Sequence, residues 1–142
     1  TLVSTYKVWN VGCNKYLNVY GTNVTSLHNH QNVCLLSNSG TIEQKWYIPS
    51  LASKVYIRSS IDTSYGLNVY RTGDPWNCDL LPVSGNETDA QVNFIRTSNG
   101  YKIKLSNYNL YLTANSSSDG ANVYWSAGTS STYQIWNLGA AS

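Results

Sequence analysis

Histidines and carboxylates are the side chains that most catalysis would need, and their spacing here marks no catalytic arrangement. His28 and His30 lie two positions apart in a polar segment, residues 22–31, without a marked third metal ligand or a partner nucleophile. Only 7 Asp and Glu residues are scattered along 142 positions, and no pair is marked for glycoside hydrolysis. We therefore expect no catalytic residue, no metal and no cofactor in this domain.

Tyrosine and tryptophan offer a different chemistry, the binding of polar molecules. The chain has 12 Tyr and 5 Trp but 1 Phe. These rings carry a polar group on a large apolar face, which suits half-exposed surfaces that bind polar ligands. Aromatic residues also brace β-strands, and we assign about half of them to that role.

The charge balance excludes two classes of partner. The net charge is +2, and the Lys and Arg residues are scattered, so we expect binding neither to nucleic acid nor to an anionic membrane. No stretch approaches the ~20 apolar residues of a membrane-spanning helix. The chain begins at Thr1 without an initiator methionine, which favours processing or excision from a longer chain.

The elements that position these side chains recur three times. Gln-x-Trp or a variant of it stands at residues 44–46, 91–93 and 134–136, and an Asn-led apolar run begins at Asn32, Asn77 and Asn122. Leu-Asn-Val stands at residues 17–19 and 67–69, with a weaker copy at 112–114. Because these features repeat in step, the sequence predicts one domain, 1–142, built from three units at about 1–52, 53–98 and 99–142.

Short β-branched or aromatic runs, bounded by Gly, Asn, Ser and Asp, predict strands and turns rather than helices. We expect twelve strands, four per unit, near residues 6–10, 16–20, 33–36, 45–49, 54–58, 67–70, 78–81, 92–97, 101–105, 110–114, 123–126 and 135–138. Such strands must close on themselves, because open edges invite aggregation. Three units are below the usual minimum of about four blades for a propeller, so an all-β β-trefoil is favoured.

The three cysteines leave the redox state open. Cys13 and Cys34 fall in the first unit and can pair, which would leave Cys78 over. In the alternative interpretation, Cys34 and Cys78 are small buried residues on strands, and we favour this for Cys78.

The repeated triplets, the Leu-Asn-Val runs and the Asn-Val-x-Leu run resemble the ricin-B-type lectin domains, or family 13 carbohydrate-binding modules, over essentially the whole chain. The resemblance implies a β-trefoil that binds sugars in up to three shallow pockets, one per unit. In the family an Asp accepts hydrogen bonds from sugar hydroxyls, and Asn18, Asn68 and Thr113 stand in its place here.

The resemblance also implies roles for the triplets. Their tryptophans fill the core, and the glutamines steady the sugar-binding residue from behind: Gln44, Gln91 and Gln134. Asn93, where a Trp is expected, should loosen the core of the second unit.

Sugar-stacking rings must come from new positions, because Leu36, Leu81 and Ser126 stand where the family has its aromatic platform. We predict one pocket from Asn68, Tyr70, Asp74 and Trp76, and a weaker one from Asn18, Tyr20, His30 and Glu43. The third unit, with Thr113 and Asn115, is expected to be degenerate or to recognise a different ligand.

These patterns lead us to expect a secreted, non-catalytic carbohydrate-binding protein, either free-standing or the accessory domain of a larger enzyme or toxin. Its partners would be glycans or polysaccharide, with a flanking domain or partner protein as a further option. The alternative is a β-trefoil that binds protein, such as a protease inhibitor or an adhesion or receptor-binding module. In that case residues 22–31 would form the contact loop.

Overall fold

Residues 4–141, which the computed structural model describes, form twelve strands and two short 3-10 helices. The first unit contains β1 (Thr5–Asn10), β2 (Tyr16–Val19), β3 (Gln31–Leu36), η1 (Ile42–Gln44) and β4 (Trp46–Tyr47). The second contains β5 (Arg58–Ser59), β6 (Tyr65–Tyr70), β7 (Trp76–Pro82) and β8 (Val92–Thr97). The third contains β9 (Gly100–Leu105), β10 (Tyr111–Ala114), β11 (Ala121–Ser126), η2 (Thr132–Gln134) and β12 (Trp136–Ala140). The expected four strands per unit are confirmed. No helix in this part of the chain is long and apolar enough to cross a membrane.

Six of the strands close on themselves as a barrel. β1 pairs with β4 and β12, β4 pairs with β5, and β9 pairs with β8 and β12. The ring is completed by a bridge between Val55, just before β5, and Val92 at the start of β8. Each barrel strand is therefore paired on both sides, which protects its edges from other chains.

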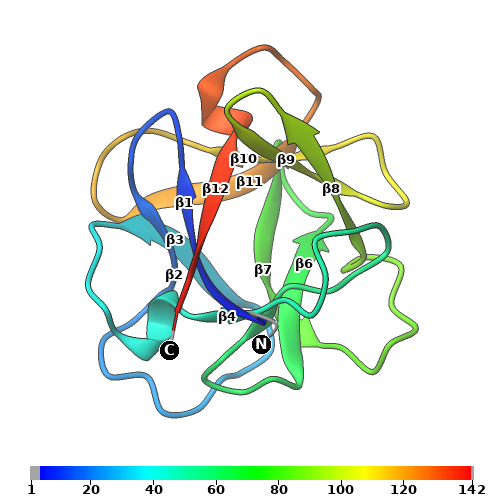
Figure 1. Ribbon diagram of the computed structural model, residues 1–142. Coiled ribbons are helices and arrows are strands. Elements are labelled where there is room, and N and C mark those ends of the chain that lie inside the picture. Colours follow the sequence, from blue (N-terminus) through cyan, green and yellow to red (C-terminus); the bar gives the residue numbers. More distant parts are fainter. Residues whose placement is uncertain (1–3, 142) are drawn as a thin grey trace.

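The other six strands form three hairpins, β2–β3, β6–β7 and β10–β11. β3, β7 and β11 also pair with one another, so the hairpins meet around a common axis. Figure 1 shows the three units around this axis, the first in blue and cyan, the second in green and the third in yellow to red. This is the β-trefoil that the sequence predicts.

Three asparagines close a ring of hydrogen bonds where the hairpins meet. Asn32 Nδ2 donates to Asn122 Oδ1 (3.0 Å), Asn122 Nδ2 to Asn77 Oδ1 (2.7 Å), and Asn77 Nδ2 to Asn32 Oδ1 (2.9 Å). A carboxamide suits this ring because it donates and accepts at once. The evenly spaced Asn-led runs of the sequence therefore mark the pseudo-threefold axis.

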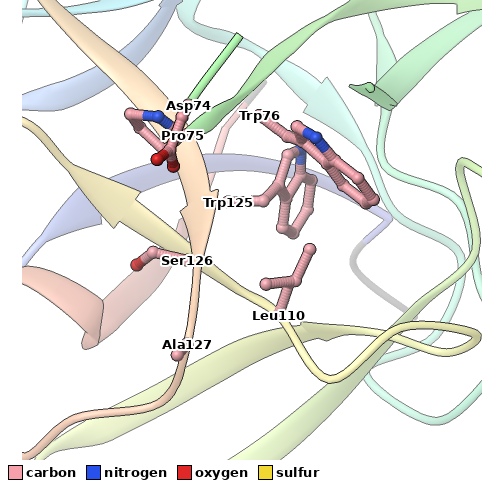
Figure 2. A pocket seen from close by; sticks show the side chains of 7 residues that line it. All are labelled: Asp74, Pro75, Trp76, Leu110, Trp125, Ser126 and Ala127. Carbon is pink, nitrogen blue, oxygen red and sulfur yellow. The ribbon is translucent and has the colours of Figure 1, made fainter. Parts of the chain in front are cut away.

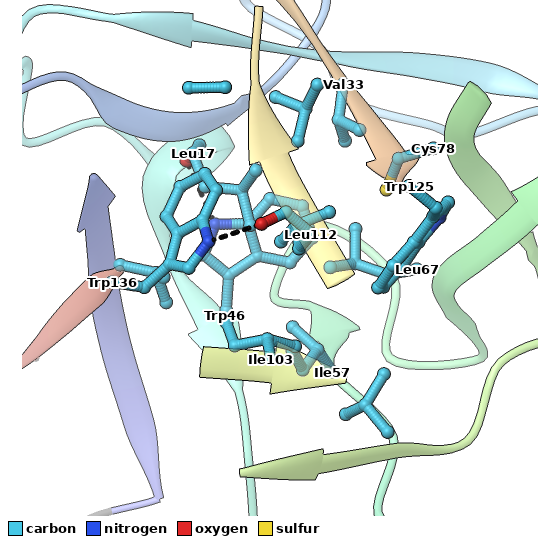
Figure 3. Packing of buried hydrophobic residues seen from close by; sticks show 14 of the residues in the cluster. Leu17, Val33, Trp46, Ile57, Leu67, Cys78, Ile103, Leu112, Trp125 and Trp136 are labelled. Atoms are coloured by element: carbon cyan, nitrogen blue, oxygen red, sulfur yellow. Dashed lines mark hydrogen bonds between the residues drawn. The ribbon is translucent and has the colours of Figure 1, made fainter. Parts of the chain in front are cut away.

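Two of the core tryptophans come from the repeated triplets. Trp46 and Trp136 are fully buried, and each indole Nε1 donates at 3.0 Å to a backbone carbonyl, of Leu17 and of Leu112 respectively (Figure 3). The bond satisfies the one polar group of each buried ring. Large side chains can therefore fill the core without leaving a donor unpaired.

The second unit does not align with the other two as its sequence suggests. The bridge Val55–Val92 takes the place that the pair Tyr6–Trp46 holds in the first unit. Val92, rather than Asn93, is therefore the counterpart of Trp46. The alignment of residues 91–93 with the other triplets is wrong by one residue.

The loosened core expected in the second unit is also not found. Val92 is fully buried, and the core holds a third indole, that of Trp125 in β11, which is 1% exposed (Figure 3). Trp125 Nε1 donates to the carbonyl oxygen of Asn68 at 3.2 Å. The third core indole thus comes from a hairpin strand and not from a triplet.

The strand expected near residues 54–58 is shorter than predicted, since pairing is confined to the Val55 bridge and β5. Lys54 adopts the left-handed region, with φ of 58°, which interrupts an extended strand. Its backbone N–H donates to Asn93 Oδ1 at 2.9 Å. The Asn93 side chain therefore stabilises this bend and does not belong to the core.

Candidate functional site

Each unit places one polar side chain near the end of the first strand of its hairpin. The register sets Asn18 opposite Cys34, Asn68 opposite Asp79 and Thr113 opposite Tyr124. These positions are the ones at which the resemblance implies sugar contact. The second unit differs from the others because an amide here faces a carboxylate.

Asp79 is the buried centre of this arrangement. Asn68 Nδ2 donates to its Oδ1 at 3.0 Å, His30 Nδ1 lies 2.7 Å from its Oδ2, and the carboxylate is 1% exposed. Burial raises the pKa of Asp79, and the hydrogen bonds from Asn68 and His30 oppose that rise. A buried carboxylate needs such partners, so Asp79 holds the other two side chains in place.

Sequence reasoning missed Asp79, although a signal was present. It is the one charged residue in β7, and the register of the hairpin sets it opposite Asn68. A charge inside an apolar run marks a position with a specific partner.

His30 belongs with the second unit, although it follows the loop of the first. Its backbone N–H donates to the carbonyl of Leu80 at 2.8 Å, and its ring stacks on Tyr70 with centroids 4.3 Å apart. The prediction that groups His30 with Asn18, Tyr20 and Glu43 is therefore wrong. The reason is that β3 and β7 are neighbours around the axis, which sequence distance does not reveal.

Arg71 and Asp89 form the rim of the same site. Arg71 Nε donates to Asp89 Oδ2 at 3.3 Å, and Tyr108 donates its hydroxyl to Asp89 Oδ1 at 2.8 Å. The Arg71 guanidinium lies 6.0 Å from the centre of the Tyr108 ring. A hydrogen bond to Asp89 raises the pKa of Tyr108, since the carboxylate accepts from the neutral hydroxyl.

These residues line a continuous hollow that we call the Asn68 groove. One part, of about 320 Å³, is lined by His30, Asn68, Val69, Tyr70, Arg71, Thr72, Leu81 and Asp89. The adjoining part, of about 370 Å³, shares four of these residues and is further lined by Pro82, Asn86, Glu87 and Thr88. The groove thus combines an exposed aromatic pair with several convergent polar groups.

The corresponding site in the first unit is smaller and more self-contained. Asn18 and Glu43 line a hollow of about 180 Å³, as predicted for this pair. Asn18 Nδ2 donates to the carbonyl of Val19 at 2.7 Å, and Glu43 Oε2 accepts from the backbone N–H of Val24 at 2.7 Å. Although burial opposes it, this hydrogen bond lowers the pKa of Glu43. Tyr20, which is 62% exposed, is not among the lining residues.

In the third unit, the polar side chains at the end of the hairpin hydrogen-bond to other groups of the same unit. Thr113 Oγ1 lies 2.8 Å from Ser126 Oγ, and Gln134 Nε2 donates to Thr113 Oγ1 at 3.1 Å. Gln134 also donates to the carbonyl of Ala127 at 2.8 Å and accepts from the backbone N–H of Thr129. This bonding leaves the hairpin end occupied by its own side chains.

The glutamines of the triplets differ in what they touch. Gln44 is buried and donates to the carbonyl of Ser37 at 2.9 Å, whereas Gln91 is half-buried and accepts from Asn107 Nδ2 at 3.3 Å. The expected support from Gln91 is therefore wrong, because Ala90 takes the place of Gln44 in the second unit. Gln134 does contact Thr113, because its Nε2 donates to Thr113 Oγ1.

Asp74 and Trp76 line a different pocket from Asn68 and Tyr70. This Trp76 pocket, of about 260 Å³, is lined by Asp74, Pro75, Trp76, Leu110, Trp125, Ser126 and Ala127 (Figure 2). The prediction of one shared pocket is therefore wrong. Trp76 pairs with Trp125 at the start of β7, so its ring faces the third unit.

The residues that the structure describes contain no group of three or more His, Cys, Asp and Glu that could hold a metal ion. His28 Nδ1 lies 3.1 Å from the carbonyl oxygen of Asn29. Its neighbour His30 is bound to Asp79. The two histidines therefore serve separate local contacts.

Comparison with known proteins found no matching family model and no matching curated protein. Solved structures do match. The designed threefold-symmetric protein ThreeFoil has a TM-score of 0.84 and 25% identity, covering 94% of this chain and 96% of its own. A ricin B-like lectin of Macrolepiota procera, solved with lactose, has a TM-score of 0.78 and 16% identity, covering 97% and 96%. The exo-β-1,3-galactanase 1,3Gal43A of Clostridium thermocellum has a TM-score of 0.84 and 20% identity, covering 96% of this chain and 30% of that one.

The pairing of the strands and the structural likeness agree. Six strands form a closed barrel, three hairpins meet at a ring of asparagines, and matches with designed and natural trefoils extend over nearly the whole chain. The chain therefore has the β-trefoil fold, and it is similar in structure to ricin B-like lectins.

Proposed function

We propose that this protein binds glycans, without catalysing their conversion, through the Asn68 groove. The observation that carries the proposal is the convergence of the exposed Tyr70–His30 ring pair with Arg71 and Asp89 in one hollow. Sugar rings present apolar C–H faces that aromatic rings cover, while their hydroxyls need nearby donors and acceptors. The groove offers both.

The polar residues divide these tasks. Arg71 has five guanidinium N–H donors in a fixed geometry, of which Nε serves Asp89. The two Asp89 oxygens accept from Arg71 and Tyr108, and each carboxylate oxygen can accept a further bond from a hydroxyl. Asn68 adds an amide at the floor, held by Asp79.

The carboxylates that border the groove are committed to protein groups, which supports binding rather than hydrolysis. Asp79 is buried between Asn68 and His30, and Asp89 is bound to Arg71 and Tyr108. Glu87 accepts from the backbone and hydroxyl of Ser84. Glycoside hydrolysis needs one carboxyl as acid and a second as base or nucleophile, both facing the bond to be cleaved.

An open hollow of this kind gives weak individual binding, on the order of millimolar, since little surplus free energy remains after ordering costs. Several sites or a linked domain would raise the avidity. The likeness to a part of the Clostridium thermocellum galactanase supports a role as a module of a larger protein, and the likeness to a lectin supports a free-standing one.

The test is a glycan array followed by isothermal titration calorimetry of the wild type, Arg71→Ala and Arg96→Ala. Arg96 is the matched control, because its guanidinium lies 5.3 Å from the Tyr101 ring centre, much as Arg71 lies over Tyr108, but it lies outside the groove. We expect Arg71→Ala to weaken glycan binding about tenfold, the usual scale of a lost charge-assisted hydrogen bond, and Arg96→Ala to leave it unchanged. Absence of binding to every glycan, or equal binding by the two variants, would overturn the proposal.

A further inference from the structure

The Trp76 pocket lies immediately beside the Asn68 groove, and one short stretch of chain separates them. Arg71 and Thr72 line the groove, while Asp74, Pro75 and Trp76 line the pocket. Consecutive Cα atoms are about 3.8 Å apart, so Thr72 and Asp74 lie within about 7.6 Å of each other. A ligand that crosses this stretch can reach both hollows.

A chain of side-chain contacts also joins the two. Tyr108 donates to Asp89 of the groove at 2.8 Å, and its ring meets Trp76 edge to face, with centroids 5.9 Å apart at 87°. Tyr108 thereby contacts both the rim of the groove and the wall of the pocket. These two contacts fix the position of the pocket relative to the groove.

The chemistry of the Trp76 pocket matches a sugar ring. Figure 2 shows the indoles of Trp76 and Trp125 on one side of the hollow, Leu110 below them, and Asp74 with Pro75 on the other side. The aromatic and aliphatic walls suit the C–H face of a pyranose, and the exposed Asp74 carboxylate can accept from its hydroxyls. Its volume of about 260 Å³ is below the ~300–1,000 Å³ typical of ligand pockets, which limits it to a single ring.

We propose that the Trp76 pocket is a second subsite of the Asn68 groove, so that the preferred ligand is an oligosaccharide with neighbouring rings on either side of residues 71–75. The inference rests on the proposed function. It makes the site specific for chains over single sugars, because the second ring adds a contact without a second loss of overall translational freedom. This subsite lies where the second and third units meet, and Ser126 and Ala127 of the third unit are among its lining residues.

Ala127 allows a test that does not remove a core residue. It is exposed and lines the pocket, so Ala127→Phe obstructs the hollow, while Ala127→Ser is a matched control that leaves it open. The probes are methyl β-glycosides of galactose, glucose, xylose and N-acetylglucosamine, and the corresponding β-linked tetrasaccharides. Binding is measured by calorimetry, and the indole N–H resonance of Trp76 by NMR, assigned with Trp76→Phe.

We expect at least one tetrasaccharide to bind about tenfold tighter than its monosaccharide and to shift the Trp76 resonance. Ala127→Phe should abolish that gain but keep monosaccharide binding, and Ala127→Ser should retain both. If Arg71→Ala weakens binding while Ala127→Phe changes nothing, the subsite is overturned and the proposed function stands. The subsite is also overturned if no tetrasaccharide shifts the indole N–H resonance of Trp76. The same holds if tetramethylammonium, a cation that aromatic walls can bind, shifts that resonance and the tetrasaccharides do not. If neither Arg71→Ala nor Ala127→Phe affects any glycan, both proposals fail.

Discussion

His30 Nδ1 lies 2.7 Å from Asp79 Oδ2, which ties a loop of the first unit to a buried carboxylate of the second. The same histidine ring stacks on Tyr70, so one contact orients both the floor and the aromatic wall of the groove. Because Asp79 is almost fully buried, its charge depends on His30 and Asn68 for compensation.

Asp79 should make stability depend on pH in an identifiable way. Burial raises its pKa in the folded protein above the unfolded value of about 3.9. Its contribution to stability is therefore complete below about pH 3.9 and is lost as the pH rises through the folded-state pKa. We expect the free energy of unfolding of Asp79→Asn, relative to wild type, to increase as the pH rises from about 4, measured by urea denaturation.

Other carboxylates have the opposite effect on the pH dependence of stability. They are present in both wild type and Asp79→Asn, so their contributions cancel in the difference between the two unfolding free energies. Hydrogen bonds lower the pKa of Asp62, and, although burial opposes it, they also lower that of Glu87. Their contributions are present above the unfolded pKa and are lost as the pH falls. Parallel curves for wild type and Asp79→Asn would show that the Asp79 proton is not linked to folding.

Trp125 and Val92 should behave as a coupled pair. Trp125→Leu should cost about 2–4 kcal/mol of unfolding free energy, because it opens a cavity in the second unit. Val92→Trp alone should cost about 1–3 kcal/mol, because a large ring overpacks a fully buried position. The double variant restores the pattern of the first unit, and we expect a favourable coupling of about 1–3 kcal/mol from denaturant unfolding of all four proteins.

If the changes in unfolding free energy of Trp125→Leu and Val92→Trp simply add in the double variant, the expected coupling is absent. The two side chains would then not compete for one volume. Phe94→Leu, a neighbouring core change on β8, serves as a control that should not couple to Trp125→Leu beyond about 0.5 kcal/mol if the competition is specific.

The fold could be predicted from the sequence because its signals are local and repeated. Turn residues and short apolar runs recur in step, and Asn32, Asn77 and Asn122 fall at equal intervals on equivalent strands that meet at the axis. Such regularity constrains topology even where individual side chains vary. The register of the second unit could not be predicted, because no Trp marks the position of Val92, which stands 15 residues after Asn77, whereas Trp46 and Trp136 stand 14 residues after Asn32 and Asn122.

The site could be predicted only in part, because it is assembled across units. Asn68 and Tyr70 are two positions apart on β6, so strand alternation predicts that they lie on one face, and both line the groove. His30 and Asp79 are 49 positions apart, and only the packing of β3 against β7 joins them. Trp76 is near Tyr70 in sequence, yet the strand that it begins pairs with β11 and turns its ring to another pocket.

The asparagine ring should be a shared stabilising element. Asn77→Ala removes the donor of one hydrogen bond and the acceptor of another, so we expect a loss of about 1–3 kcal/mol in unfolding free energy. Asn86→Ala, at an exposed position, should change stability by less than about 0.5 kcal/mol. Equal melting temperatures for the two variants would show that the ring contributes nothing beyond solvent bonds.

The number of free thiols should show whether any of the three cysteines are paired in a disulfide, which the sequence alone does not decide. Cys13, Cys34 and Cys78 are all free in the structure, and burial raises the pKa of each. Cys13 is half-buried, whereas the other two are buried, so we expect one slowly reacting thiol per native chain and three in denaturant, titrated with an aromatic disulfide reagent at about pH 8. Cys13→Ser should abolish the native reaction. If only one thiol appears in denaturant without reductant and three appear with it, two of the three cysteines are paired instead.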